Sequence, residues 1–150
     1  GKVRSNNKRR TEFGMFNSGS HDEEVAEGAD QTAAPQDLGA ILYIPRGGKK
    51  KVRGPRRVLI GLPTVDENDQ LTAHSASGWT GKNTMVNNFK SRDLRGLNVL
   101  MSNEGVFDEA VGGFVCNFGE SVKEASAVNL QVGLASLPRV VCWLDSSATS

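Results

Sequence analysis

The stretch Arg46–Arg57 carries seven Lys and Arg side chains in twelve residues, together with three glycines, one proline and no acid. Cations held this close together repel one another, so the segment favours an anionic partner. Each Lys or Arg that replaces a counterion on a nucleic acid adds a salt-dependent contribution to affinity. Arginine can donate two parallel hydrogen bonds to a phosphate, and lysine acts as a compact charge. The candidate binding residues of this segment are Arg46, Lys49, Lys50, Lys51, Arg53, Arg56 and Arg57.

A second basic cluster lies near the beginning of the chain. Aromatic residues are scarce beside both clusters, with Tyr43 near the first and Phe13 and Phe16 near the second. We therefore expect both clusters to bind along the phosphates of a nucleic acid, with RNA as the preferred candidate. Little base stacking or sequence preference is expected. The candidate binding residues of the second cluster are Lys2, Arg4, Lys8, Arg9 and Arg10.

Three other interpretations of the segment Arg46–Arg57 stay open. It can be a solvated charged loop without a partner. The sequence "KKVR" at Lys50–Arg53 has the K-K-x-R form of a nuclear import signal, a short pattern with many false positives. The same cations can also bind an anionic membrane surface, where each contributes about 1 kcal/mol.

The remaining motifs do not indicate catalysis. The sequence "GWTGKNT" at residues 78–84 contains a Gly-Lys pair, but its spacing differs from that of a phosphate-binding loop. His74 lies in a polar segment, and no sequence rule places an acid beside it. The cysteines Cys116 and Cys142 lack the paired spacing of zinc ligands and are predicted to be buried free thiols, with a disulfide as the alternative. The acidic cluster Asp66, Glu67 and Asp69 is typical of a solvated turn, with a site for a hard cation as the alternative. We expect no enzyme, no metal and no cofactor.

Charge is segregated along the chain although the net charge is +1. Residues 1–20 carry five cations and one acid, residues 21–38 carry six acids and no Lys or Arg, and residues 39–57 carry seven cations and no acid. The polar composition of residues 1–38 predicts a disordered charged arm. Residues 39–150 then form a single β-rich domain, which can be a truncated one. The absence of an apolar run or a leader sequence indicates a soluble intracellular protein.

Short apolar segments separated by Gly, Pro, Asn and Ser predict the fold. Alternation is clearest at residues 128–134, where Val and Leu alternate with polar residues or glycine. Helices of one or two turns are expected at residues 120–127 and 106–111. Seven or so short strands predict a mainly β protein, an antiparallel sandwich or barrel. The expected strands lie at residues 38–45, 58–63, 85–89, 97–101, 113–119, 128–134 and 139–145.

This organisation, a basic disordered arm followed by a β-domain of short strands, is similar to that of the coat, nucleocapsid or matrix proteins of RNA viruses. In those families the arm neutralises packaged RNA while the β-domain assembles, so the resemblance implies self-association and a location in the virion or host cytoplasm. The stretch "LPRVVCWL" at residues 137–144 resembles a strand of plant-virus movement proteins. We expect a non-enzymatic RNA-binding coat or nucleocapsid protein. The alternative is a matrix or movement protein that places the same cations on anionic lipid.

Overall fold

The computed structural model describes most of the chain in several separate stretches. These are residues 1–17, 36–44, 57–71, 84–119, 122, 130–136, 138–141 and 144. The elements within them are β1 (Lys2–Ser5), β2 (Glu12–Phe16), β3 (Asp37–Ile44), β4 (Arg57–Pro63), α1 (Met85–Ser91), β5 (Leu97–Ser102), β6 (Val106–Asp108), β7 (Gly113–Val115) and β8 (Val132–Leu134).

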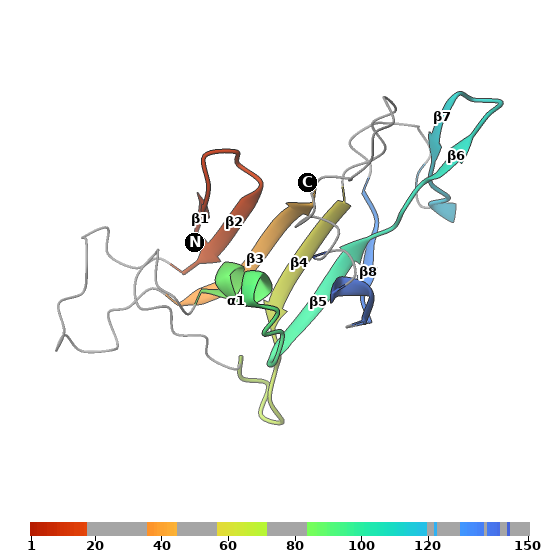
Figure 1. Ribbon diagram of the computed structural model, residues 1–150. Helices are drawn as coiled ribbons and strands as arrows, with labels where there is room; N and C mark the ends of the chain where they lie inside the picture. Colours follow the sequence, from red (N-terminus) through yellow and green to blue (C-terminus); the bar gives the residue numbers. More distant parts are fainter. Residues whose placement is uncertain are drawn as a thin grey trace, which may run out of the picture.

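Six of the strands form one antiparallel sheet in the order β1-β2-β3-β4-β5-β8 (Figure 1). Strands β6 and β7 form a separate antiparallel hairpin. The predicted mainly β, antiparallel fold with a short helical element is therefore confirmed.

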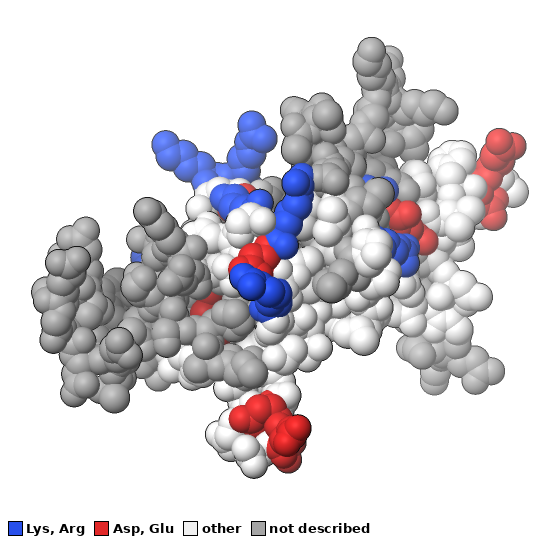
Figure 2. Space-filling model, turned by 60° about the horizontal axis from the view of Figure 1, so that its bottom comes forward, with Lys and Arg blue, Asp and Glu red and all other residues white. Residues whose placement is uncertain are grey.

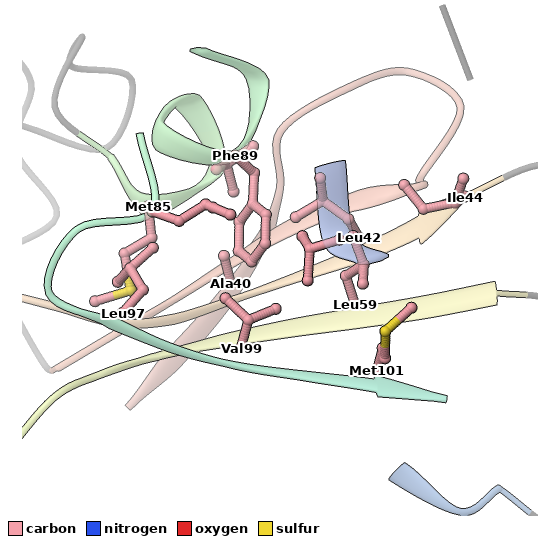
Figure 3. Packing of buried hydrophobic residues seen from close by; sticks show 12 residues of the cluster. Ala40, Leu42, Ile44, Leu59, Met85, Phe89, Leu97, Val99 and Met101 are labelled. Atoms are coloured by element: carbon pink, nitrogen blue, oxygen red, sulfur yellow. The ribbon is translucent and has the colours of Figure 1, made fainter. Parts of the chain in front are cut away.

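The core lies on the face of the sheet that α1 covers. In the register of the sheet, Leu42 of β3 is opposite Leu59 of β4, and Leu59 is opposite Met101 of β5. All three side chains are buried, and Phe89 of α1 packs among them (Figure 3). Every second side chain along β4 and β5 points to this face. Both strands could be predicted from the sequence because each is a short run rich in apolar, strand-favouring residues.

The structure differs from the expected disordered arm at two places, β1 and β2. Both strands pair with their neighbours, and the sheet continues from them into β3. Phe16 at the end of β2 is 2% exposed. The composition of residues 1–17 gave little sign of this order, because the backbone hydrogen bonds and the burial come from β3, which is distant in sequence. Residues 18–35 of the expected arm lie outside the described residues.

Three other elements were predicted with the wrong type. Residues 85–89 form the first turns of α1 rather than a strand, residues 138–141 are helical rather than extended, and Val106–Asp108 is strand β6 rather than a helix. A short apolar run contains too few residues to distinguish the periodicity of a helix from that of a strand. No helix among the described residues is long and apolar enough to cross a membrane.

Candidate anion-binding pocket

The turn between β1 and β2 is held in shape by Asn7. The Asn7 side chain donates from Nδ2 to Thr11 Oγ1 at 2.8 Å and accepts at Oδ1 from the Thr11 backbone N–H at 2.9 Å. The Arg10 N–H donates to the Asn7 carbonyl at 3.1 Å, and Arg10 adopts a positive φ of 51°. This folding presents Lys8, Arg9 and Arg10 at the tip of the turn, where all three are exposed.

One backbone hydrogen bond and one aromatic contact fix this turn and the start of β2 to β3. The Tyr43 N–H donates to the Thr11 carbonyl at 2.7 Å. The rings of Phe13 and Tyr43 meet edge to face, with their centroids 6.0 Å apart. The cations of the turn are therefore carried on a supported element next to the sheet.

The end of α1 brings two further cations to the same region. Thr84 caps the start of the helix by accepting from the Asn87 N–H at 3.3 Å. Lys90 lies in the last turn, and Arg92 ends the helix in the left-handed conformation with φ of 60°. Cations at this end complement the partial negative charge of the helix C-terminus. Phe89, buried beneath them, fixes the helix to the sheet.

These elements line an open pocket of about 340 Å³. Arg9 comes from the β1–β2 turn, and Lys90 and Arg92 come from the end of α1. Asn7 and Thr11 also line the pocket, and its apolar wall comes from β3, α1 and the chain near residue 144. Three cations beside polar side chains and a partly apolar wall suit a ligand with an anionic head and an apolar continuation. The apolar lining residues are Leu42, Ile44, Phe89 and Leu144.

One acid lies among these cations. Glu12 of β2 lines the same pocket, and its Oε2 atom is 2.9 Å from Lys90 Nζ. Figure 2 shows Lys and Arg side chains gathered near the middle of one face, next to acidic side chains. Among the described residues, the charged side chains of the lining carry three positive charges and one negative charge. The excess of cations makes the pocket a candidate site for anions.

The structure brings together only part of the predicted binding residues. Arg9 lines the pocket, whereas Lys2 and Arg4 lie on β1, and Lys8 and Arg10 lie on the same turn as Arg9 without lining the pocket. Lys90 and Arg92 were missed. The only signals for them in the sequence were the N-cap Thr84 and the following run of residues that forms α1.

The basic stretch Arg46–Arg57 is described at its last residue only. Arg57 begins β4, and its Nε atom pairs with Glu104 Oε1 at 2.7 Å. The other candidate residues of that stretch lie outside the described residues: Arg46, Lys49, Lys50, Lys51, Arg53 and Arg56. The stretch begins directly after β3, two residues beyond Ile44, which lines the pocket.

The other candidates for chemistry gather no site in the part of the chain that the structure describes. Within that part, no three His, Cys, Asp or Glu side chains come together as metal ligands would. Asp66 instead orders its own exposed turn by accepting from the N–H groups of Asn68 and Gln70. Cys116 is a half-buried free thiol. His74 and Cys142 lie outside the described residues.

Comparisons with known proteins identify relatives along nearly the whole chain. Residues 1–142 match the Tub family. Tubby protein homolog 1 of Caenorhabditis elegans is 27% identical over 93% of this chain, and Tubby-related protein 2 of Homo sapiens is 27% identical over 88% of it. Protein king tubby 2 of Culex quinquefasciatus is 25% identical over 88% of the chain. The matched regions span 32%, 24% and 29% of these relatives, so the chain corresponds to about a third of their length or less.

These matches overturn the viral interpretation. The expectation of an RNA-binding coat, nucleocapsid, matrix or movement protein is wrong, as is the expected location in the virion, because the relatives are cellular proteins of animals. The resemblance rested on a basic segment beside short strands. That combination reflects local charge and strand propensity, which unrelated families share, and it carries no pattern specific to a viral fold.

Proposed function

The chain belongs to the Tub family, and from that premise we propose that this domain binds the anionic phosphate-bearing headgroup of a membrane phospholipid. The observation that carries the proposal is the pocket in which Arg9, Lys90 and Arg92 converge from two separate elements. Guanidinium groups suit phosphate because their donors match two phosphate oxygens at once, and a lysine adds a compact charge.

The dimensions and lining of the pocket favour a headgroup over an extended polymer. Its volume of about 340 Å³ lies within the range of sites for small ligands, roughly 300–1,000 Å³. Among the residues that the structure describes, the aromatic side chains in its lining are Tyr43 and Phe89, and Phe89 is fully buried. A surface for stacked bases would present several exposed rings. A single phosphorylated headgroup therefore fits the pocket better than a nucleic acid strand.

The basic stretch Arg46–Arg57 is proposed to assist the same binding. Cations near a membrane surface are attracted to anionic lipid at about 1 kcal/mol each, and this attraction decays within a Debye length of about 8 Å at physiological salt. The stretch adds such charge to a chain segment that begins next to the pocket. In this proposal the pocket supplies specificity, and the basic stretch increases the time spent at the membrane.

The test is co-sedimentation with phosphatidylcholine vesicles that contain phosphatidylinositol bisphosphate. The wild-type chain should sediment with these vesicles and remain in solution with phosphatidylcholine alone. The double variant Arg9→Gln/Arg92→Gln should lose at least tenfold in affinity, because each bond between a charged donor and phosphate contributes about 1.5–3 kcal/mol.

Arg95→Gln is the matched control. Arg95 is also an arginine beside α1, but it does not line the pocket, and its guanidinium pairs with Asp93 at 2.8 Å. That hydrogen bond and the Asp93 charge raise the pKa of Arg95, so Arg95 is charged in the wild type and the control variant removes one positive charge. Its vesicle affinity should remain within about twofold of the wild type, since Arg95 does not line the pocket. The fold should also be retained, because an exposed ion pair contributes little to stability. Equal losses in both variants, or retention by RNA oligonucleotides instead of vesicles, would show that the pocket is not a lipid site.

A further inference from the structure

Glu12 places a carboxylate inside a pocket that otherwise attracts anions. Its side chain is 19% exposed, and Oε2 is shielded from solvent. The partner atom, Lys90 Nζ, belongs to a side chain that is 52% exposed. The pair joins β2 to the last turn of α1 across the pocket.

This carboxylate occupies a position at which a ligand phosphate oxygen would be bound. At 2.9 Å from Nζ, it makes the contact that a phosphate oxygen would make with the same ammonium group. A ligand that enters must therefore share Lys90 or separate it from Glu12. The negative charge of Glu12 also repels an anion at short range, where screening by water is incomplete.

The position of Glu12 in the sheet keeps the carboxylate there. Glu12 is opposite Leu42 in the register of β2 and β3, so its side chain projects from the same face as the buried Leu42 and toward α1. Its carbonyl accepts from the Asn6 N–H at 2.7 Å, which fixes the backbone at the start of β2. Because the strand holds the residue, the carboxylate cannot leave the pocket without a rotamer change.

We propose that Glu12 is a built-in competitor for the ligand, an autoinhibitory carboxylate that holds Lys90 in the free protein and is displaced when an anionic headgroup binds. The inference rests on the proposed function, because it concerns regulation of the same pocket. It assigns opposite roles to two residues that form one ion pair. Lys90 contributes to binding, and Glu12 weakens it.

The experiment measures affinity for the same phosphatidylinositol bisphosphate vesicles in four chains: the wild type, Glu12→Gln, Lys90→Gln and the double variant. Glu12→Gln should bind about three- to tenfold more tightly, because the repulsion is removed and Lys90 is released. Lys90→Gln should bind at least about three- to tenfold more weakly than the wild type, since it leaves the Glu12 carboxylate without its counter-charge. The double variant has the same net pocket charge as the wild type and should lie within about twofold of it.

A purely structural role for the pair gives a different result. The free energy of unfolding, measured in urea for all four chains, would then fall in both single variants, and neither would bind more tightly than the wild type. A wild type that binds while Glu12→Gln binds equally or more weakly overturns the inference and leaves the proposed function standing. If neither the wild type nor Glu12→Gln binds these vesicles, the proposed function fails and the inference fails with it.

Discussion

Asp37 joins the start of α1 to the sheet with a buried carboxylate. Its side chain is 1% exposed, and Oδ2 accepts from the Met85 N–H at 2.6 Å. Thr84 satisfies a further N–H of the same turn. The helix has seven residues, fewer than the roughly 12–15 that an isolated helix needs for marginal stability. These caps and the burial of one face must therefore supply the stability of α1.

We expect Asp37→Ala to lower the free energy of unfolding by about 2 kcal/mol, because it leaves a buried helix N–H without this acceptor. Urea denaturation followed by circular dichroism measures the change. Asp66→Ala is the control, because Asp66 also accepts backbone N–H bonds but lies in an exposed turn. Its loss should be about 0.5 kcal/mol or less. Similar losses in the two variants would contradict the role assigned to Asp37.

The residues of the pocket show what can be predicted from local charge. Counting cations in a window of the sequence identifies contiguous clusters, and it identified Arg9 in this way. Lys90 and Arg92 lie in a stretch, residues 90–95, that holds three cations and one acid, a weaker excess than that of the two basic clusters. Their importance arises because α1 packs on the sheet beside the β1–β2 turn, a long-range contact that no window contains. The charge of Glu12 is visible in the sequence, but its position beside Lys90 could not be predicted for the same reason.

At the scale of elements, α1 packs on the sheet through one close approach. Phe89 is fully buried, and its ring lies over Gly61 of β4. A Cβ atom added at Gly61 would lie 2.9 Å from Phe89 Cζ and closer still to Cε2. Non-bonded carbon atoms are optimally separated by about 3.5–4.0 Å, so a methyl group does not fit there. Glycine at this position is what lets the helix lie directly against the sheet.

Gly61→Ala should therefore destabilise the protein by about 1–3 kcal/mol, although alanine is ordinarily the better residue in a strand. Phe89→Leu removes part of the ring that causes the clash. The double variant should be more stable than the sum of the single losses predicts, by about 0.5 kcal/mol or more. Urea unfolding of the three variants measures this coupling.

Gly133→Ala is the matched control, because Gly133 also lies in a strand and an added Cβ meets no atom of the described residues within 4 Å. It should leave stability unchanged or raise it slightly. Strict additivity of Gly61→Ala and Phe89→Leu would show that the helix can shift away from the sheet at little cost.

The elements differ in how far their own local sequence predicts their structure. Strands β4 and β5 could be predicted, since each is a short run in which apolar residues that favour strands follow one another in the sequence. The helix α1 could not, because its sequence contains two asparagines, a valine and a phenylalanine, none of which favours a helix strongly. Strand β1 carries only one apolar residue, Val3, which is 63% exposed. Its order comes from pairing with β2, which the sequence of β1 does not indicate.

At the scale of the whole molecule, the pocket unites segments that are far apart in the sequence. Arg9, Ile44 and Lys90 lie on the β1–β2 turn, on β3 and on α1, and all three line it. The like charges of Arg9, Lys90 and Arg92, which line the same pocket, repel one another across these segments. An anionic ligand reduces that repulsion in the folded protein. The unfolded chain holds the same cations apart and gains much less.

Ligand binding should therefore raise the melting temperature of the entire domain. Inositol trisphosphate is a suitable soluble probe, and free inositol is its uncharged control. At about one hundred times the dissociation constant, a ligand that binds only the folded state contributes about 2.7 kcal/mol. For a chain of this length that corresponds to a shift of about 5–10 °C. Differential scanning calorimetry should show this shift in the wild type and in Arg95→Gln, and no shift in Arg9→Gln/Arg92→Gln. A shift of equal size with free inositol, or in the double variant, would mean that the ligand stabilises the protein at another place.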